Sequence, residues 1–287
     1  MDRASLSSPQ IAAWLEGLEP VWTMLTYESY CDVNFPDRKR AGVTLNDAVT
    51  TQALTASPLL ENARILIACC AEHNGLQATA AGNLGRRAVG ELVERLAWPN
   101  YDAEIALSWC TVVNEHDVHP LHFLRQLLGM MKLIRPRGGR FVATHTGQRL
   151  LRPESGAQLF HRLFRAIFDD VDLSWLYPHR LPVWPQQDWR LVCWGLSVAA
   201  CRWESPKTLS RLCTVPVIGI LESDWDVAPS LLEGRLLKPL TWLGLLEVKP
   251  NDDDAPPDKR SLYRTSALFR EFFRFDVDIE APATVVH

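Results

Sequence analysis

The stretch from residue 120 to residue 151 limits the possible folds more than any other part of the chain. Pro120 suits the first turn of a helix, where its missing N–H group costs nothing. Apolar residues then recur at intervals of three and four, as one buried helical face requires: Leu121, Leu124, Leu127, Leu128 and Met131. We therefore predict a helix that begins at Pro120 and ends between residues 129 and 132.

A two-stranded hairpin is predicted directly after this helix. Strands over residues 133–135 and 141–143 flank the glycine pair 138–139, and glycine accepts the positive φ angles of a tight turn. Thr144 or Thr146 can then cap one more short helix. The order helix, strand, glycine turn, strand is typical of the second half of a winged helix-turn-helix unit.

Two further helices are predicted before this segment. Ser57 and Pro58 open an apolar helix that ends at a glycine and lies at the centre of a core. After a short extended piece, residues 84–96 form an amphipathic helix that Asn83 caps. Residues 58–152 are thus predicted to form a first winged-helix-like domain.

The last third of the chain has the same order of elements. A buried helix over 189–203 precedes a helix capped by Ser205, a third helix, a hairpin and a closing helix that ends near residue 275. Thr265 takes the place of Thr144. The similarity is one of pattern, so duplication and coincidence both stay open. We predict a mainly α fold with two winged-helix-like units.

The intervening sequence indicates where the domains divide. Residues 153–188 combine an apolar helical stripe, which is typical of a core, with a proline-rich stretch that cannot continue a helix. The predicted organisation has four parts: an N-terminal helical and loop segment (1–57), the first domain (58–152), a connecting helix and linker (153–188), and the second domain (189–287).

Two segments resemble a known family. The sequence TAAGNLGRRAVGELVERL and the later run NEHDVHPLHFLRQLLGMMKLIRPRGGRFVATHTGQRLL are similar to the helical region associated with plasmid open-reading-frame-three-like proteins of prokaryotes. In that family a threonine and Gly-Asn-Leu open one helix, and a glycine wing followed by Thr-x-x-Gly closes a winged unit. The resemblance covers residues 58–152, with a weaker echo in 189–275. It implies a winged-helix fold and transfers no catalytic residue.

The hairpin is the candidate binding site, because positive charge gathers around it. Between residues 132 and 152 six side chains are basic and none is acidic: Lys132, Arg135, Arg137, Arg140, Arg149 and Arg152. Arg135, Arg137 and Arg140 flank the turn, where guanidinium groups reach phosphates. Arg125 and Gln126 are the long polar side chains of the preceding helix, and these types read guanine and adenine edges. The alternative is that the arginines pair internally or keep the hairpin soluble.

These features favour a non-enzymatic protein that binds double-stranded DNA through the basic wing. The rival function is a protein-interaction or dimerisation module, in which degenerate winged helices dock a partner or a second copy. The second hairpin loop favours the rival for its own unit, since Asp252, Asp253, Asp254 and Asp258 would repel phosphate.

The sequence supports a metal, cofactor or catalytic site less well than a binding site. His116, His119 and His122 are zinc-type ligands beside Glu115 and Asp117, but Pro120 prevents one helix from carrying all three histidines. His119 or Asp117 then caps the helix. No phosphate loop, nucleophile elbow or H-E-x-x-H motif occurs. We expect no metal, no cofactor and no catalysis.

Composition sets the remaining limits. With a net charge of -4 the whole chain has no bulk attraction to nucleic acid, so any contact must be local. Seven cysteines without a C-x-x-C pair indicate neither a zinc knuckle nor a disulfide framework. No apolar run is long enough for a membrane span, and we expect a cytoplasmic protein without membrane partners.

Overall fold

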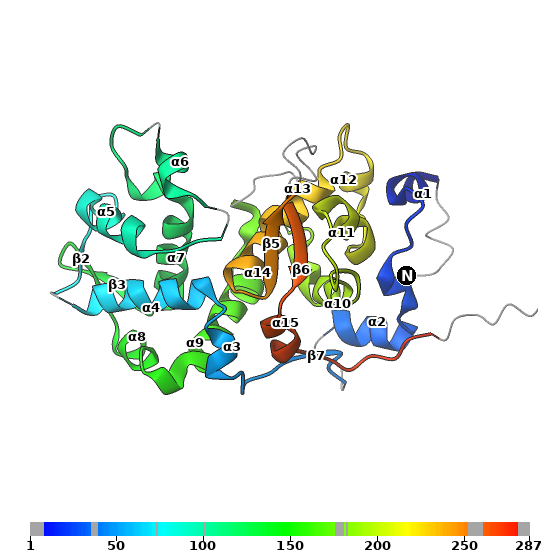
Figure 1. The fold of residues 1–287 in the computed structure, drawn as a ribbon, viewed down its shortest axis with the longest axis horizontal. Coiled ribbons are helices and arrows are strands. Elements are labelled where there is room, and N and C mark those ends of the chain that lie inside the picture. The colour runs from blue at the N-terminus through cyan, green and yellow to red at the C-terminus, as the bar shows by residue number, and fades with distance from the viewer. Residues whose placement is uncertain are drawn as a thin grey trace, which may run out of the picture. The chain divides into compact units, whose positions relative to one another are not determined.

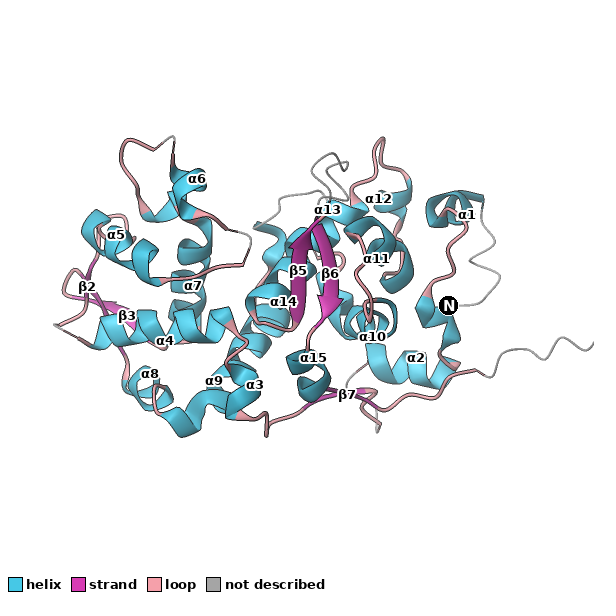
Figure 2. Ribbon diagram, in the orientation of Figure 1, coloured by secondary structure: helices cyan, strands magenta, loops and turns pink. Residues whose placement is uncertain are grey.

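The computed structural model describes residues 9–35, 40–72, 74–99, 101–108, 110–175, 181, 183–251 and 261–280. Helices dominate these residues, and the strands form three small antiparallel sheets (Figure 2). The prediction of a mainly α fold is confirmed. No helix in the described ranges combines the length and apolar character needed to cross a bilayer.

The chain divides into two compact units. The wing unit comprises residues 47–171 and 241–244, and the terminal unit comprises residues 1–46, 172–240 and 245–287. These boundaries differ from the predicted ones, because the segment 153–171 belongs to the wing unit and the first 46 residues belong to the terminal unit.

The wing unit is built from helices around one three-stranded sheet (Figure 1). Its helices are α3 (Thr51–Leu54), α4 (Pro58–Ala71), α5 (Arg86–Arg95), α6 (Ala103–Leu107), α7 (His119–Met130), α8 (His145–Leu150) and α9 (Gly156–Arg165), and a π-helical turn (Ala166–Asp170) follows α9. Its strands are β2 (Leu76–Gln77), β3 (Ile134–Arg137) and β4 (Arg140–Ala143), in the order β2-β4-β3.

The spacing of apolar residues explains the core of this unit. The predicted inward positions of α7 are fully buried at Leu121, Leu124 and Leu127, and α7 packs against α4. The stripe on α9 and its π-helical turn is buried as well, which confirms that it is core: Leu159, Phe160, Leu163, Phe164, Ile167 and Phe168. Since α9 packs on α3, α4 and α8, it is part of the unit and not a connecting helix.

The terminal unit brings together distant parts of the chain. Its helices are α1 (Pro9–Leu15), α2 (Tyr27–Asn34), α10 (Trp189–Ala199), α11 (Pro206–Cys213), α12 (Ile218–Leu221), α13 (Ala228–Leu232), α14 (Lys238–Trp242), whose last two residues count with the wing unit, and α15 (Ala267–Phe272). Its strands are β1 (Val43–Leu45), β5 (Leu246–Pro250), β6 (Ser261–Thr265) and β7 (Phe273–Phe275).

The N-terminal segment packs into this unit through an apolar cluster. Trp22, Leu25 and Val33 pack with Leu191 and Trp194 of α10. The predicted closing helix is shorter than expected: it ends at Phe272, and the next three residues form β7, which pairs with β1 in antiparallel register. The pairing joins residues more than two hundred positions apart, so local propensity did not reveal it.

Helix caps test the local predictions. Ser57, Thr144 and Ser205 each accept a hydrogen bond from a backbone N–H of the helix that they precede, as predicted. The Asn83 prediction is wrong, because α5 begins after Gly85 and has no side-chain cap. Ser266, one residue later than the predicted Thr265, caps α15.

The two units repeat one set of hydrogen bonds. In the wing unit the N–H of Leu133 bonds to the carbonyl of Leu128, and the N–H of Thr144 bonds to the carbonyl of Leu133. In the terminal unit the corresponding bonds run from Leu245 to Leu240 and from Ser266 to Leu245. Each set closes a helix, starts a hairpin strand and anchors the next helix.

Candidate nucleic-acid interface

The candidate interface starts from the β3–β4 ribbon. Gly138 and Gly139 have φ angles of +56° and +72°, so both residues of the turn need the left-handed region. Residues alternate between the faces of a strand, and Arg137 lies directly opposite Arg140. Arg135, Arg137 and Arg140 therefore share the outer face, while Ile134 and Phe141 are buried.

The three wing arginines differ in their partners. Arg135 and Arg137 are exposed, and neither has a carboxylate within ion-pair distance among the residues that the structure describes. Arg140 is exposed too, and its Nη1 donates to the carbonyl of Gly75 at 2.9 Å. The hairpin predicted from the glycine pair is present, and its cationic side chains lie outside the core.

Arg125 does not lie free on the surface of α7. Its Nε donates to Oε1 of Glu115 at 2.9 Å, its Nη2 donates to Oδ1 of Asn83 at 3.3 Å, and its guanidinium group lies 5.4 Å from the centre of the Phe141 ring. Only 14% of the Arg125 side chain is exposed. The side chain predicted to read bases is thus held by an internal ion pair.

Glu115 organises this region, and the sequence had indicated it only as a weak metal ligand. Its side chain is fully buried, and one carboxylate oxygen accepts from the backbone N–H of Leu84. The other oxygen serves Arg125 and lies 2.6 Å from Nδ1 of His122. A buried carboxylate needs several hydrogen-bond donors. The sequence signal for this role was an acidic residue just before a helix.

Gln126 belongs to the same network. Its Nε2 lies 2.7 Å from Nε2 of His122, which in turn contacts Glu115. The predicted pair Arg125 and Gln126 is therefore brought together on α7, but both side chains already have partners within the unit. The chain from Gln126 through His122 and Glu115 to Arg125 fixes the surface of α7 that faces the ribbon.

A groove lies between α7 and β3. It has a volume of about 740 Å³, and we call it the wing groove; its lining is Gly82, Arg125, Gln126, Gly129, Met130, Lys132, Ile134, Arg135, Pro136, Phe141 and Thr144. Three of these residues are cationic, and no acidic residue is among them. Met130 and Pro136, which are both exposed, add a nonpolar part to the lining.

Lys132 stands out among the lining residues by its backbone. Its φ angle is +56°, in the region that favours glycine. It lies two residues before the start of β3, and its carbonyl accepts from the Thr144 hydroxyl at 2.8 Å. Lys132 belongs to the basic stretch seen in the sequence, but it was not predicted to be a site residue.

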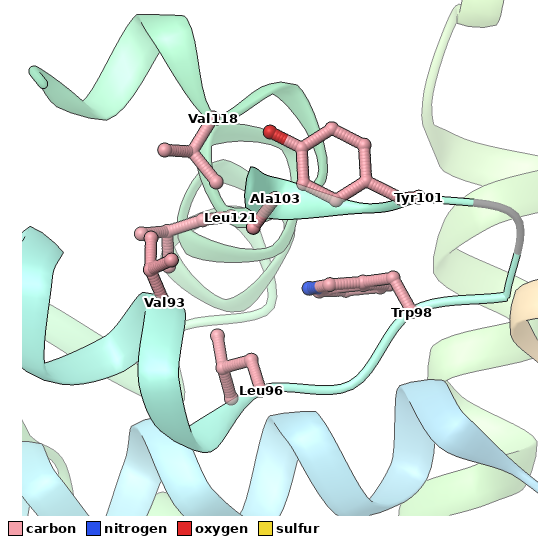
Figure 3. Close-up of a pocket in the computed structure, with 7 residues that line it drawn as sticks. All are labelled: Val93, Leu96, Trp98, Tyr101, Ala103, Val118 and Leu121. Carbon is pink, nitrogen blue, oxygen red and sulfur yellow. The ribbon is translucent and has the colours of Figure 1, made fainter. Parts of the chain in front are cut away.

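A second hollow in the wing unit is much smaller (Figure 3). Its volume is about 30 Å³, and its lining is Val93, Leu96, Trp98, Tyr101, Ala103, Val118 and Leu121. Burial raises the pKa of the Tyr101 hydroxyl, which has no hydrogen-bond partner among the described residues. A space of this size holds one or two water molecules and no organic ligand.

The predicted cap of α7 and the histidines behave differently from expectation. Val118 precedes α7 without a side-chain cap, and Asp117 instead accepts from the backbone N–H of Asn114 at 2.8 Å, which lowers the pKa of that carboxyl. His116 contacts Asp117, whereas His122 contacts Glu115. Within the described ranges no three His, Cys, Asp or Glu side chains group as a metal site requires.

The β5–β6 ribbon of the terminal unit provides an internal comparison. Glu247 lies directly opposite Arg264 and forms an ion pair with it. Lys249 and Arg264 both lie over the ring of Trp203, at 4.9 Å and 4.6 Å from its centre. Within the two described strands, each cation of this ribbon therefore has a side-chain partner: Arg264 has Glu247, and Lys249 has the Trp203 ring. The acidic loop of residues 252–258, which the sequence analysis expected to repel phosphate, lies outside the described residues.

Part of the chain is similar to known proteins. The uncharacterized protein y4jL of Sinorhizobium fredii (strain NBRC 101917 / NGR234) is 27% identical over 124 residues. The match covers 43% of this chain and 51% of that relative, so the similarity spans about half the length of the curated protein. No solved structure matches. Residues 55–157, which contain α7, the ribbon and the wing groove, are similar to the family described as the Y4jL N-terminal domain.

Proposed function

We propose that the wing unit is a winged helix that binds double-stranded DNA through Arg135, Arg137 and Arg140. The order of its elements supports this: α4, β2, α5, α7, β3 and β4 follow the winged-helix order, with the short helix α6 inserted between α5 and α7. The resemblance to plasmid open-reading-frame-three-like proteins stays part of this proposal.

One observation carries the proposal: the outer face of the ribbon holds three arginines without a carboxylate partner in the described part of the chain. Arg137 and Arg140 lie directly opposite each other, and like charges in that position destabilise a strand pair. A row of phosphates would neutralise this face.

The other ribbon of the same chain strengthens this reasoning. Counting from the helix-terminating leucines, Arg135 and Glu247 occupy the same place, each two residues after Leu133 or Leu245. Glu247 is paired across the ribbon with Arg264, whereas Arg135 lies opposite the uncharged Val142. The fold does not require the unbalanced arrangement, so we assign the uncompensated charge to a ligand.

A salt titration tests the proposal. The affinity for duplex DNA should fall as salt rises, and replacing all three wing arginines by alanine should reduce the slope of log K against log salt by up to about 0.9 for each lost phosphate contact. A matched control replaces three exposed cations elsewhere, Arg87, Lys249 and Arg270, by alanine. This control changes the net charge by the same amount as the wing variant does. It should keep most of the slope of log K against log salt.

Two results would contradict the proposal. An equal loss of slope in the wing variant and in the control would show that only net charge matters. Absence of binding by the unaltered protein at low salt would remove the nucleic-acid function altogether.

A protein-interaction function is the second candidate, and a specific observation favours it in the terminal unit. Ile218 and Trp225 are 72% and 70% exposed, although both are large apolar side chains. Exposed side chains of this kind are common in docking surfaces. Dimerisation that is lost on replacing Ile218 and Trp225 by serine, measured by analytical ultracentrifugation, would support this role.

The remaining parts of the proposal are that the protein acts by binding, without catalysis, and that it works in the cytoplasm. The first part agrees with a proposed site that consists of cations on a ribbon.

A further inference from the structure

The wing groove differs in chemistry from the ribbon face beside it. Arg135 and Lys132 supply positive charge at the groove, while the exposed residues Met130 and Pro136 supply apolar surface. A duplex presents phosphates and sugars, and its base faces are hidden in the stack. Polar backbone placed on an apolar surface loses water without gaining partners, so a duplex alone uses this groove poorly.

An unpaired nucleotide matches both parts of the lining. Its base has an apolar face that stacks on side chains, and its phosphate is an anion. The volume of about 740 Å³ lies in the range of sites for small organic molecules. Arg125 adds a planar group that is already fixed, since its guanidinium lies over Phe141 and is bonded to Glu115.

Lys132 supports a ligand at this place independently of the lining. Its φ of +56° is a conformation that lysine adopts only at an energetic cost. The structurally corresponding residue before the β5–β6 ribbon is Gly244, with φ of +76°. Residues kept in unfavourable conformations cluster at functional sites. Lysine thus occupies a position that favours glycine, and it is one of the three cations that line the groove.

We propose that the wing groove binds one unpaired nucleotide, with the base on the apolar lining and the phosphate at Lys132 and Arg135. The inference rests on the proposed nucleic-acid function and narrows its substrate class. The preferred ligand is then a junction of duplex and single strand, with the duplex along the ribbon face and the first unpaired nucleotide in the groove.

Gly129 allows a sharp test. It is an exposed helical glycine at the end of α7 that lines the groove, and an added Cβ would meet no atom within 4 Å. Gly129→Leu should therefore fold, and it should fill the groove. Gly90 in α5 is also exposed and equally open, but it does not line the groove. Gly90→Leu is the matched control.

The measurement is fluorescence anisotropy with a blunt duplex and with the same duplex carrying a five-nucleotide overhang. The unaltered protein and Gly90→Leu should prefer the overhang by about tenfold, the effect of roughly one stacked base. Gly129→Leu should bind both probes equally. Thermal unfolding should show that neither variant is less stable than the unaltered protein, because leucine is a better helix former than glycine.

The outcomes separate this inference from the proposed function. Equal binding of both probes by the unaltered protein overturns the groove assignment but leaves duplex binding intact. A preference for the overhang probe that survives in Gly129→Leu has the same meaning. If polyglutamate competes with the overhang probe as effectively as an unlabelled single strand does, the groove is a site for acidic peptides. This result also overturns the assignment. Failure to bind either probe overturns the proposed function itself.

Discussion

Replacing Lys132 by glycine should make the protein more stable and weaken its binding to nucleic acid. Lys132 ends α7 in the left-handed conformation: its own N–H bonds to the carbonyl of Gly129, and the next N–H bonds to the carbonyl of Leu128. This arrangement closes many helices, and glycine is the residue that usually occupies it. Gly244, which ends the helix before the β5–β6 ribbon, has the same arrangement.

The size of the effect follows from two opposing terms. A residue other than glycine loses about 1–2 kcal/mol in the left-handed region. Glycine gains additional freedom in the unfolded chain, which costs about 0.4–1 kcal/mol on folding. The net gain for Lys132→Gly is then on the order of 0.5–1 kcal/mol. For a unit of this size the melting temperature should rise by about 2–4 °C per kcal/mol.

A second variant separates strain from charge. Lys132→Ala removes the ammonium group but keeps a Cβ, so its stability should stay close to that of the unaltered protein. Both variants should lower the salt slope of nucleic-acid binding by about 0.7–0.9, the contribution of one phosphate contact. Urea unfolding and a salt titration measure the two quantities on the same preparations.

Two findings would refute this reasoning. If Lys132→Gly is less stable than Lys132→Ala, the left-handed backbone is not a source of strain. If both variants bind with an unchanged slope, the lysine does not contact a phosphate.

Two further predictions concern ion pairs. Glu115→Gln should lower the free energy of unfolding in urea by about 3 kcal/mol, because it removes the charge partner of the largely buried Arg125. Combining it with Arg125→Met should recover part of this loss. An equal or larger loss in the double variant would contradict the pairing. Arg40 holds the pKa of the Asp276 carboxyl below its usual value through hydrogen bonds. The pair therefore stabilises the fold at pH values above the pKa of this carboxyl in the unfolded chain. The stabilisation disappears as the pH falls through the lower pKa of the folded state. Arg40→Ala should return the Asp276 pKa to near 4 in an NMR titration, and an unchanged low pKa would show another cause.

The elements that could be predicted from sequence are those whose signals are local. Pro120 and the spacing of apolar residues specified α7, and the glycine pair specified a turn in which both residues have positive φ. Thr144 caps α8 because a hydroxyl directly after the hairpin strand can accept from the N–H of Gly147. Such features depend on a few neighbouring residues, so a single sequence contains them.

The candidate site was harder to predict, because its geometry depends on distant residues. Glu115 reaches the backbone of Leu84, thirty-one positions away, and this contact decides that Arg125 faces a carboxylate and not solvent. In the sequence, Glu115 has the same appearance as an acidic residue at the positive end of a helix dipole. The choice between these roles is made by burial, and burial depends on how α5 and α7 pack.

The two ribbons explain why a shared framework does not imply a shared ligand. Both follow a helix-terminating turn and precede a capped helix, with the same hydrogen bonds at each end. At the second position after that turn, one ribbon has Arg135 and the other has Glu247, so the sign of the charge is opposite. Since backbone hydrogen bonds are independent of this side chain, the charge can change without cost to the fold. An Arg135→Glu variant should then fold normally with the ribbon intact, by circular dichroism and urea unfolding, and should weaken the proposed binding to duplex DNA.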